Sequence, residues 1–412
     1  MLRLVSVVGL FVLLGLCFAL SRERRRISWR LVAGGLLIQF ALGATFLYWD
    51  TGNALLRDFA DEVKYFLDLS KGGTVFVFGV LADGEAIANT WGPARGFVFA
   101  TMVLPTLIFF SALMAVLYHL GIMQLIVRGM AHVMARLLGT SGAESLSACG
   151  NIFVGQTEAP LLVRPFLARM TKSELHAVMT GGFATIAGGV FALYVGFGVD
   201  PGHLMVASVM AAPAGLVVSK ILWPETEESE TAGKVVHATE RTASNVVEAA
   251  ANGASDGLRL ALNVGAMLIA FLGLVAVADW LLHFISDDLT VGSILSWLFW
   301  PIAAVMGVPS AEISQLSELL GTKLALTELV AYQKLGDFMH AENPISARTT
   351  LIASFALCGF ANVGSVAIQI GGLGAIAPER RTDLSRLAFR AMFAGAIATC
   401  ITACLAGALS DV

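Results

Sequence analysis

The chain has 412 residues, of which 57% are apolar and only 14% charged, with a formal net charge of −4 and a mean hydropathy of +0.78. A soluble globular protein would carry about a quarter charged residues, and several stretches here exceed the roughly 20 apolar residues that cross a bilayer. The composition excludes a soluble globular protein and predicts an all-α polytopic protein in a lipid bilayer, with no nucleic-acid partner.

The first apolar stretch, residues 3–20, is similar to the core of a signal peptide. A signal peptide carries its positive charge before the apolar run, whereas here the arginines at 22 and 24–26 follow it. We therefore expect a retained first span with its N-terminus outside. The further spans are expected at 31–49, 97–118, 174–198, 203–223, 258–285, 346–371 and 388–408, which gives eight transmembrane helices.

Lysine and arginine gather on alternate connections between these spans. Cytoplasmic loops carry an excess of both residues. With the N-terminus outside, the basic clusters at 22–30, 128–172, 220–259 and 380–390 all fall on the cytoplasmic side. We therefore expect a protein of the cell (inner) membrane with both termini outside.

Residues 53–67 have the pattern of an amphipathic helix. Apolar residues at 55, 59, 63 and 66 recur at helical spacing, opposite charged residues at 57, 58, 61 and 62. Such a helix typically lies along the membrane interface. A soluble cap is the alternative reading.

Two regions do not fit a simple span. The segment 125–170 enters and leaves on the cytoplasmic side, and the segment 300–342 opens to the outside. The second is interrupted by Pro301, Gly307, Pro309 and Gly321. Both are predicted to be re-entrant hairpins, which would enter the membrane from opposite sides.

The two halves of the chain share a pattern. Thr-Glu occurs at 157–158 in the first hairpin and at 327–328 in the second, and a Gly-Phe-Ala segment follows at 182–184 and at 359–361. Opposed hairpins followed by broken helices predict inverted repeats, a signature of secondary transporters with a site near the midplane. The predicted division is 1–118 as scaffold helices with the interfacial helix, 119–223 as first repeat, 224–257 as cytoplasmic polar linker and 258–412 as second repeat.

Polar residues converge where the two repeats meet. An ionisable residue at membrane depth costs a few kcal/mol even on lenient scales, so Glu158 and Glu328 are expected to bind something. Carboxylates accept from hydroxyls and ring N–H groups, whereas amides donate and accept. The set suits a neutral, hydroxyl-rich solute, with Val190 and Phe360 as an apolar wall. Its polar members are Gln156, Thr157, Glu158, Glu328, Asn362 and Ser365.

A second, smaller site is expected beside the first. Asn151, the carbonyls freed at Val154, Thr185 and Ile186, and the hydroxyl of Thr185 offer only hard oxygen ligands. Such ligands suit a small alkali cation better than a transition metal. A cap for loose backbone groups of the hairpin is the alternative role of Asn151.

Three segments resemble the concentrative nucleoside transporter family. They are Asn-Ile-Phe-Val-Gly-Gln-Thr-Glu-Ala-Pro-Leu-Leu-Val-Arg-Pro at 151–165, His-Ala-Val-Met-Thr-Gly-Gly-Phe-Ala-Thr-Ile-Ala-Gly at 176–188 and Cys-Gly-Phe-Ala-Asn-Val-Gly-Ser at 358–365. The resemblance covers most of the chain from about residue 95 onward. The part before it resembles the shorter bacterial members, which have eight spans and are sodium-coupled.

The resemblance implies a homotrimer with a scaffold and a mobile transport domain, which moves a nucleoside such as uridine by an elevator-like displacement. It implies that Gln156, Thr157 and Glu158 bind the nucleobase, with Val190 and Phe360 beside it. Glu328, Asn362 and Ser365 would bind the ribose. The family's sodium-site positions fall on Asn151, Val154, Thr185 and Ile186, which favours sodium as the coupling ion.

Three alternatives remain open at this stage. Some bacterial relatives couple to protons instead of sodium. An intramembrane enzyme would use Glu158 and Glu328 as an acid–base pair, because two carboxylates in a dry cavity have shifted pKa values. A channel is the third alternative, although opposed broken repeats favour alternating access. We expect a transporter and not an enzyme.

Overall fold

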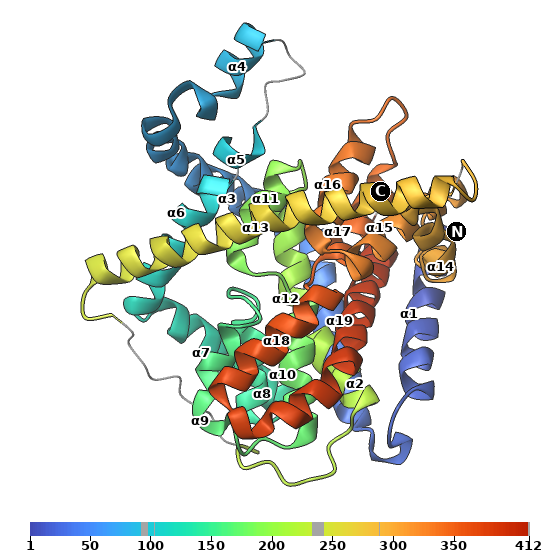
Figure 1. Ribbon diagram of the computed structural model, residues 1–412. Coiled ribbons are helices and arrows are strands. Elements are labelled where there is room, and N and C mark those ends of the chain that lie inside the picture. Colours follow the sequence, from blue (N-terminus) through green and yellow to red (C-terminus); the bar gives the residue numbers. More distant parts are fainter. Residues whose placement is uncertain (92–97, 103, 233–242, 288, 411–412) are drawn as a thin grey trace.

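The computed structural model describes residues 1–91, 98–102, 104–232, 243–287 and 289–410, and these residues form helices joined by short connections (Figure 1). Within this part of the chain the only extended pairing is one antiparallel bridge between Ser141 and Ala232. Several helices are long and apolar enough to cross a membrane, namely Leu2–Ala19, Trp29–Tyr48, Phe99–His119, Pro201–Leu222 and Pro378–Leu409. The all-helical membrane protein is confirmed, and the number of eight spans stays a prediction.

The N-terminal helices lie against the C-terminal half of the protein. α1 (Leu2–Ala19) packs mainly along α19 (Arg381–Leu409), and α2 (Trp29–Gly43) packs mainly along α12 (Pro201–Leu222). The predicted amphipathic helix at 53–67 lies inside α3 (Asp50–Phe78), which is 29 residues long. Shorter elements complete this part: η1 Arg24–Arg26, η2 Ala44–Tyr48, η3 Gly79–Ala82, α4 Gly84–Trp91 and α5 Phe99–Met102.

One long helix, α13 (Val246–His283), crosses the molecule in Figure 1, and it packs against α6 (Leu104–His119). The two helices form the most extensive helix contact of the described residues. Gly253 and Gly257 bring the two backbones together, because a Cβ at Gly257 would lie 2.7 Å from the Cα of Ile108. Small residues spaced by four allow this close approach of membrane helices.

The two repeats have matching elements. Each contains a helical hairpin, then a helix broken near its middle, then a long unbroken helix. The first comprises α8 Gly142–Gly150, η5 Ala159–Val163, α9 Arg164–Leu167, α10 Lys172–Ala184, α11 Gly188–Gly196 and α12. The second comprises α15 Ile313–Ala325, α16 Glu328–Met339, α17 Ala347–Leu357, α18 Val363–Ile376 and α19, with η7 Pro378–Arg380 directly before α19. The helix α14 Val291–Val305 and the turn η6 Ser310–Glu312 precede this hairpin, and α14 packs on α15.

Polar caps explain where these elements begin. Ser141 accepts from the backbone N–H of Glu144, whose side chain accepts from Ser141 in return, and Thr171 and Glu174 form the same capping box at the start of α10. A box of this kind satisfies two of the backbone donors that a helix start leaves unpaired. Asp200 caps α12, with Pro201 at the first helical position.

The breaks of the two split helices meet in the protein core. α10, α12, α17 and α19 pack on one another there, and α10 is buried on all sides from Ser173 to Ala184. Helices buried on every face carry no polar stripe, and the polar residues Ser173 and His176 of α10 make buried hydrogen bonds with the Trp223 carbonyl and the Ser219 hydroxyl.

Three predicted boundaries differ from the structure. The segment 125–170 is not one hairpin, because α7 (Ile122–Leu138) is a separate helix with one buried face and ends at Gly139, which has φ +71°. The segment 300–342 likewise begins within α14, and the helical hairpin itself is α15–α16. Further, α13 begins at Val246, inside the predicted 224–257 linker, because Asn245 caps it by accepting from the N–H of Glu248.

Candidate functional site

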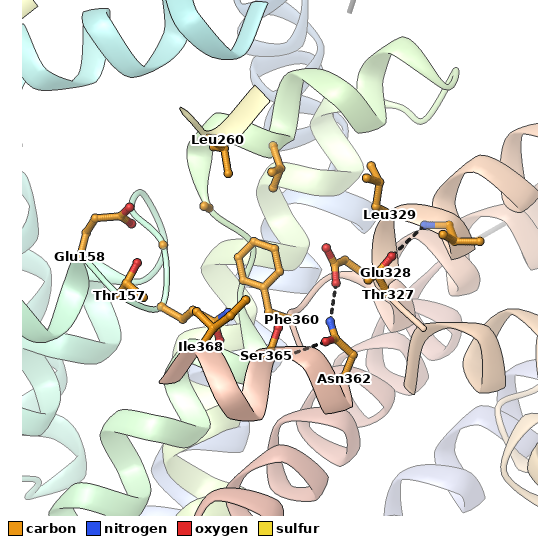
Figure 2. Close-up of a pocket in the computed structure, with 15 residues that line it drawn as sticks. Thr157, Glu158, Leu260, Thr327, Glu328, Leu329, Phe360, Asn362, Ser365 and Ile368 are labelled. Carbon is orange, nitrogen blue, oxygen red and sulfur yellow. Dashed lines mark hydrogen bonds between the residues drawn. The ribbon is translucent and has the colours of Figure 1, made fainter. Parts of the chain in front are cut away.

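One cavity of about 190 Å³ lies where the two hairpin tips meet the two helix breaks (Figure 2). We call it the central cavity. It is lined by all eight residues that the sequence placed at the substrate site: Gln156, Thr157, Glu158, Val190, Glu328, Phe360, Asn362 and Ser365. Apolar side chains complete the lining, among them Leu260 of α13 and Ile368 of α18. The structure therefore brings the predicted set together from both repeats.

The second hairpin presents Glu328 in a fixed orientation. Oε1 of Glu328 accepts from the Tyr194 hydroxyl at 3.2 Å, and Oε2 accepts from Nδ2 of Asn362 at 2.9 Å. Oδ1 of Asn362 in turn accepts from the backbone N–H of Ser365 at 2.8 Å and so caps α18. The ring of Tyr332 stacks on Tyr194 at 4.1 Å between centroids. This buried network leaves the remaining lone pairs of the Glu328 carboxylate as acceptors for a solute.

The first hairpin presents amide and carboxyl groups from the opposite side. Oε1 of Gln156 accepts from Nε2 of Gln369 at 3.0 Å, and the same Nε2 donates to the Met179 carbonyl at 3.1 Å. Gly182 makes room for both glutamines, since a Cβ there would lie 2.7 Å from Nε2 of Gln369. Figure 2 shows Glu158 and Glu328 on opposite sides of Phe360, so the two carboxyl groups face the cavity separately.

The two helix breaks touch at their backbones. The N–H of Phe360 donates to the Thr185 carbonyl at 3.3 Å, and a Cβ at Gly359 would lie 2.6 Å from the Phe183 carbonyl oxygen. Only glycine allows this approach, because any side chain would overlap the opposite backbone. Each Gly-Phe-Ala segment is thus a contact between the two repeats.

Of the predicted ion ligands, Thr185 and Ile186 lie at the first break, and Asn151 and Val154 lie on the first hairpin. The Thr185 carbonyl is not free, because it accepts from the N–H of Phe360. Asn151 follows α8 directly and is buried, with Nδ2 donating to the Ser147 carbonyl at 3.0 Å. Its Oδ1 is buried without a hydrogen-bond partner. An unpaired buried acceptor is costly, and a small cation would satisfy it. The hydroxyl of Thr185 donates to Gly181 at 2.9 Å, which leaves its lone pairs available. Oδ1 of Asn151 and the Thr185 hydroxyl are hard oxygen ligands, which a small alkali cation such as sodium prefers.

The sequence did not single out two residues that organise the cavity. Tyr194 lies one helical turn after Val190 and positions Glu328, and Gln369 lies one turn after Ser365 and positions Gln156. Their signal was available, because a polar side chain one turn beyond a predicted ligand shares its helix face. Thr327 was also overlooked; it caps α16 by accepting from Val330 and lines the cavity.

A second cavity of about 440 Å³ adjoins the central cavity. The two share Gly155, Glu158, Ala187 and Leu260, and the second cavity extends between the first hairpin, α6 and the first turns of α13. Its polar lining includes side chains from these three parts and from α7: Tyr118, His119, Gln124, Arg164, Asn252 and Asp256. The two cavities are therefore neighbours along the first hairpin.

Family models match almost the whole chain. Residues 203–407 match the model described as Na+ dependent nucleoside transporter C-terminus, residues 8–81 match its N-terminus counterpart, and residues 100–200 match a model described as nucleoside recognition.

Similar proteins of other organisms are likewise transporters. An uncharacterised transporter of Haemophilus influenzae is 45% identical, with 98% of this chain and 97% of that protein covered. Sodium/nucleoside cotransporter 1 of Mus musculus is 42% identical over 99% of this chain and 64% of its own length. The human counterpart is 41% identical with the same coverage. The chain thus spans a little under two thirds of these mammalian relatives.

Solved structures of a protein named CNTnw have the same fold. Its inward-facing, substrate-bound structure is 44% identical with a TM-score of 0.94, covering 99% of this chain and 98% of that one. A variant of it in an outward-facing state gives a TM-score of 0.96 over 100% and 99% of the two chains.

Proposed function

The chain belongs to the Na+-dependent nucleoside transporter family, and from this premise we propose that it imports nucleosides such as uridine by symport with sodium. One observation carries the proposal: a single cavity joins both Thr-Glu hairpin tips and both helix breaks, with a carboxylate on each side. The relatives are transporters and not enzymes, so the acid–base reading of Glu158 and Glu328 is set aside.

We assign the two sides of the cavity to the two parts of a nucleoside. Gln156, Thr157 and Glu158 bind the nucleobase, whose ring N–H and carbonyl groups match an amide and a carboxylate. Glu328, Asn362 and Ser365 bind the ribose hydroxyls. Phe360 lies between both sides and, with Val190, packs against the base. The pairing of Glu328 with Tyr194 and Asn362 supports this assignment, because it holds the carboxylate ready before the solute arrives.

We propose that sodium binds Asn151, Val154, Thr185 and Ile186 at the first break. The unpaired Oδ1 of Asn151 supports this. Asn151 lies five residues before Gln156 on the same hairpin, so an ion there orders the tip that binds the base. By linkage, sodium and nucleoside raise each other's affinity by the same factor.

We propose an elevator-type movement in a homotrimer of the cell membrane, with both termini outside. The pair α6 and α13 would stay fixed while the repeats move past it; the lining of the second cavity by these same helices supports that division. The fold's similarity to both inward-facing and outward-facing structures of one relative also fits such a movement.

Uptake into proteoliposomes tests the proposal. Labelled uridine should accumulate inside against its gradient when sodium is high outside, and counterflow should return it unmodified. Accumulation driven by a proton gradient without sodium would replace this proposal with proton coupling. Uridine that equilibrates and never accumulates would indicate a channel.

A substitution at Asn151 tests the sodium site. Asn151→Ala removes the open amide oxygen, so we expect the sodium concentration for half-maximal uridine binding to rise about tenfold or more, in line with a lost ligand to a charged group. Isothermal titration at several sodium concentrations measures this. Ser145→Ala, elsewhere on α8, is the matched control. An unchanged sodium dependence would refute the assignment.

A further inference from the structure

A buried lysine in the second repeat takes no part in the functions assigned so far. Lys323 lies in the last turn of α15 and is 1% exposed. Its Nζ donates to the Ala356 carbonyl at 2.8 Å and to the Thr399 hydroxyl at 2.9 Å. Neither acceptor carries a formal charge. Because burial of an ammonium costs several kcal/mol, something else at this position stabilises the charge.

The end of α17 supplies that stabilisation. Ala356 is the next-to-last residue of α17, which stops at Leu357 where the helix breaks. A helix C-terminus carries about half a negative elementary charge on its unpaired carbonyls. In the protein core water does not screen this charge, so the ammonium and the helix end stabilise each other.

The first repeat has the same arrangement with a different residue. There the first half of the broken helix, α10, ends at Ala184, and Asn151 lies against it from the end of α8, next to Gly181. Asn151 is neutral and its Oδ1 has no partner. In both repeats the end of the first hairpin helix meets the end of a half-helix. One repeat brings an open amide oxygen to that place, and the other brings an ammonium.

We propose that Lys323 is a resident cation, which does in the second repeat what sodium does in the first. This inference rests on the proposed sodium symport. Lys323 precedes Glu328 by five residues on the second hairpin, and Ala356 precedes Asn362 by six across the break. By joining the two, Lys323 is a positioning residue for the Glu328–Asn362 side of the cavity. That side needs no ion, and one sodium per nucleoside is sufficient.

Two substitutions separate the charge of Lys323 from its hydrogen bond. Lys323→Met removes both, and Lys323→Gln keeps a donor but removes the charge. In both we expect the preference for uridine over 3′-deoxyuridine to fall about tenfold or more, the loss typical of a charge-assisted contact. The sodium dependence set by Asn151 should remain. Binding of both ligands to the purified protein at saturating sodium measures the ratio.

Lys334→Gln is the matched control, because Lys334 also lies on the second hairpin but pairs with Glu318 near the surface, at 2.6 Å. It should keep the wild-type ratio. If Lys323→Gln also keeps that ratio, no charge is needed and the proposal is wrong. If Lys323→Met does not fold, Lys323→Gln and Thr399→Val are compared instead. Thr399→Val keeps the charge of Lys323 and removes one of its two acceptors. It should lower the ratio of uridine to 3′-deoxyuridine binding less than Lys323→Gln does.

The stoichiometry gives an independent readout. Charge movement and uridine uptake, recorded together in proteoliposomes, should give one charge per uridine for the wild type. Two charges per uridine would overturn the resident-cation proposal but leave sodium symport standing. Uridine binding that ignores sodium in the wild type would instead overturn the symport, so the two failures are distinguishable.

Discussion

Several polar side chains of the central cavity already have a protein partner on one side. Glu328 accepts from Tyr194 and Asn362, and Gln156 accepts from Gln369. At these buried positions such pairing both offsets the cost of burial and fixes the direction of the unused lone pairs. Recognition of the solute therefore depends on residues such as Tyr194 and Gln369, which orient the lining side chains, as much as on the lining side chains themselves.

The first prediction at this scale concerns the effect of the Glu328 charge on uridine affinity. Glu328→Gln removes the charge and one of the two acceptor oxygens, so one of the contacts that this carboxylate makes with Tyr194, Asn362 and the ribose is reversed or lost. We expect a loss of about 2 kcal/mol in uridine affinity, or roughly 30-fold. Equilibrium binding measures it. Glu318→Gln, which alters a surface pair with Lys334, serves as control. Unchanged binding would remove Glu328 from the ribose side.

Gln369 gives a prediction for the nucleobase side. Gln369→Met keeps the length of the side chain but leaves Gln156 and the Met179 carbonyl without their donor. One neutral hydrogen bond is worth about 1 kcal/mol, so uridine affinity should fall about fivefold. The ratio of uridine to 3′-deoxyuridine binding should not change, since the ribose side is untouched. A change in the ratio of uridine to 3′-deoxyuridine binding would contradict the assignment of separate nucleobase and ribose sides. Gln315→Met on α15 is the control.

At the scale of elements, the crossing of the two helix breaks holds the cavity together. Gly359 lies against Phe183 and Ala184, and Gly182 lies against Gln156 and Gln369. The glycines of both Gly-Phe-Ala segments thus allow backbone and side chains to approach where a methyl group would not fit. The central cavity can form because Gly182 and Gly359 have no side chain that would occupy this space.

Gly359→Ala tests that close approach. Its Cβ would overlap the Phe183 carbonyl, and the resulting shift should cost about 1–3 kcal/mol and lower the Tm of the detergent-solubilised protein. Gly371→Ala, on α18 with nothing within 4 Å, should leave the Tm unchanged or raise it through helix propensity. Equal Tm values for both variants would show that the breaks do not pack as described.

Most of the architecture at this scale was predictable, and the failures have physical causes. The hairpin tips and breaks were found because polar or glycine-rich segments interrupt apolar runs. Hydropathy could not find the start of α13, because its first turns mix valine and alanine with Glu248, Asn252 and Asp256, and only the Asn245 cap marks where the helix begins. The separation of α7 from the hairpin was visible in Gly139 and in the Ser141–Glu144 capping box, and periodicity alone missed it.

The candidate site was predictable as a set of residues but not as a network. The pattern of the repeats indicated which eight side chains converge, and all of them line the central cavity. The contribution of Tyr194, Gln369 and Lys323 depends on contacts between segments distant in the sequence, such as Lys323 with Thr399. No local pattern reveals the partner of a buried polar group.

At the scale of the whole molecule, the α6–α13 pair lies across one side of the repeats (Figure 1). Gly253 and Gly257 allow the close contact of α6 and α13.

Gly257→Leu should force the two helices apart and lower both the Tm and the transport rate, because the new side chain would overlap with backbone atoms of α6. Gly273→Leu, on α13 with nothing within 4 Å, is the control. Thermal unfolding followed by size-exclusion chromatography distinguishes them, and matching profiles would refute the prediction.

The buried ammonium of Lys323 has a consequence for the energy that transport consumes. An imported sodium ion performs electrical work of about 2.3 kcal/mol per 100 mV, which alone supports a roughly 50-fold accumulation. In the proposed elevator-type movement, the lysine would cross with the loaded carrier and return with the empty one, so its charge would do no net work over a cycle. A cell using such a carrier would reach a lower ceiling of nucleoside accumulation than two ions allow, and would spend half as much of its sodium gradient on each molecule imported.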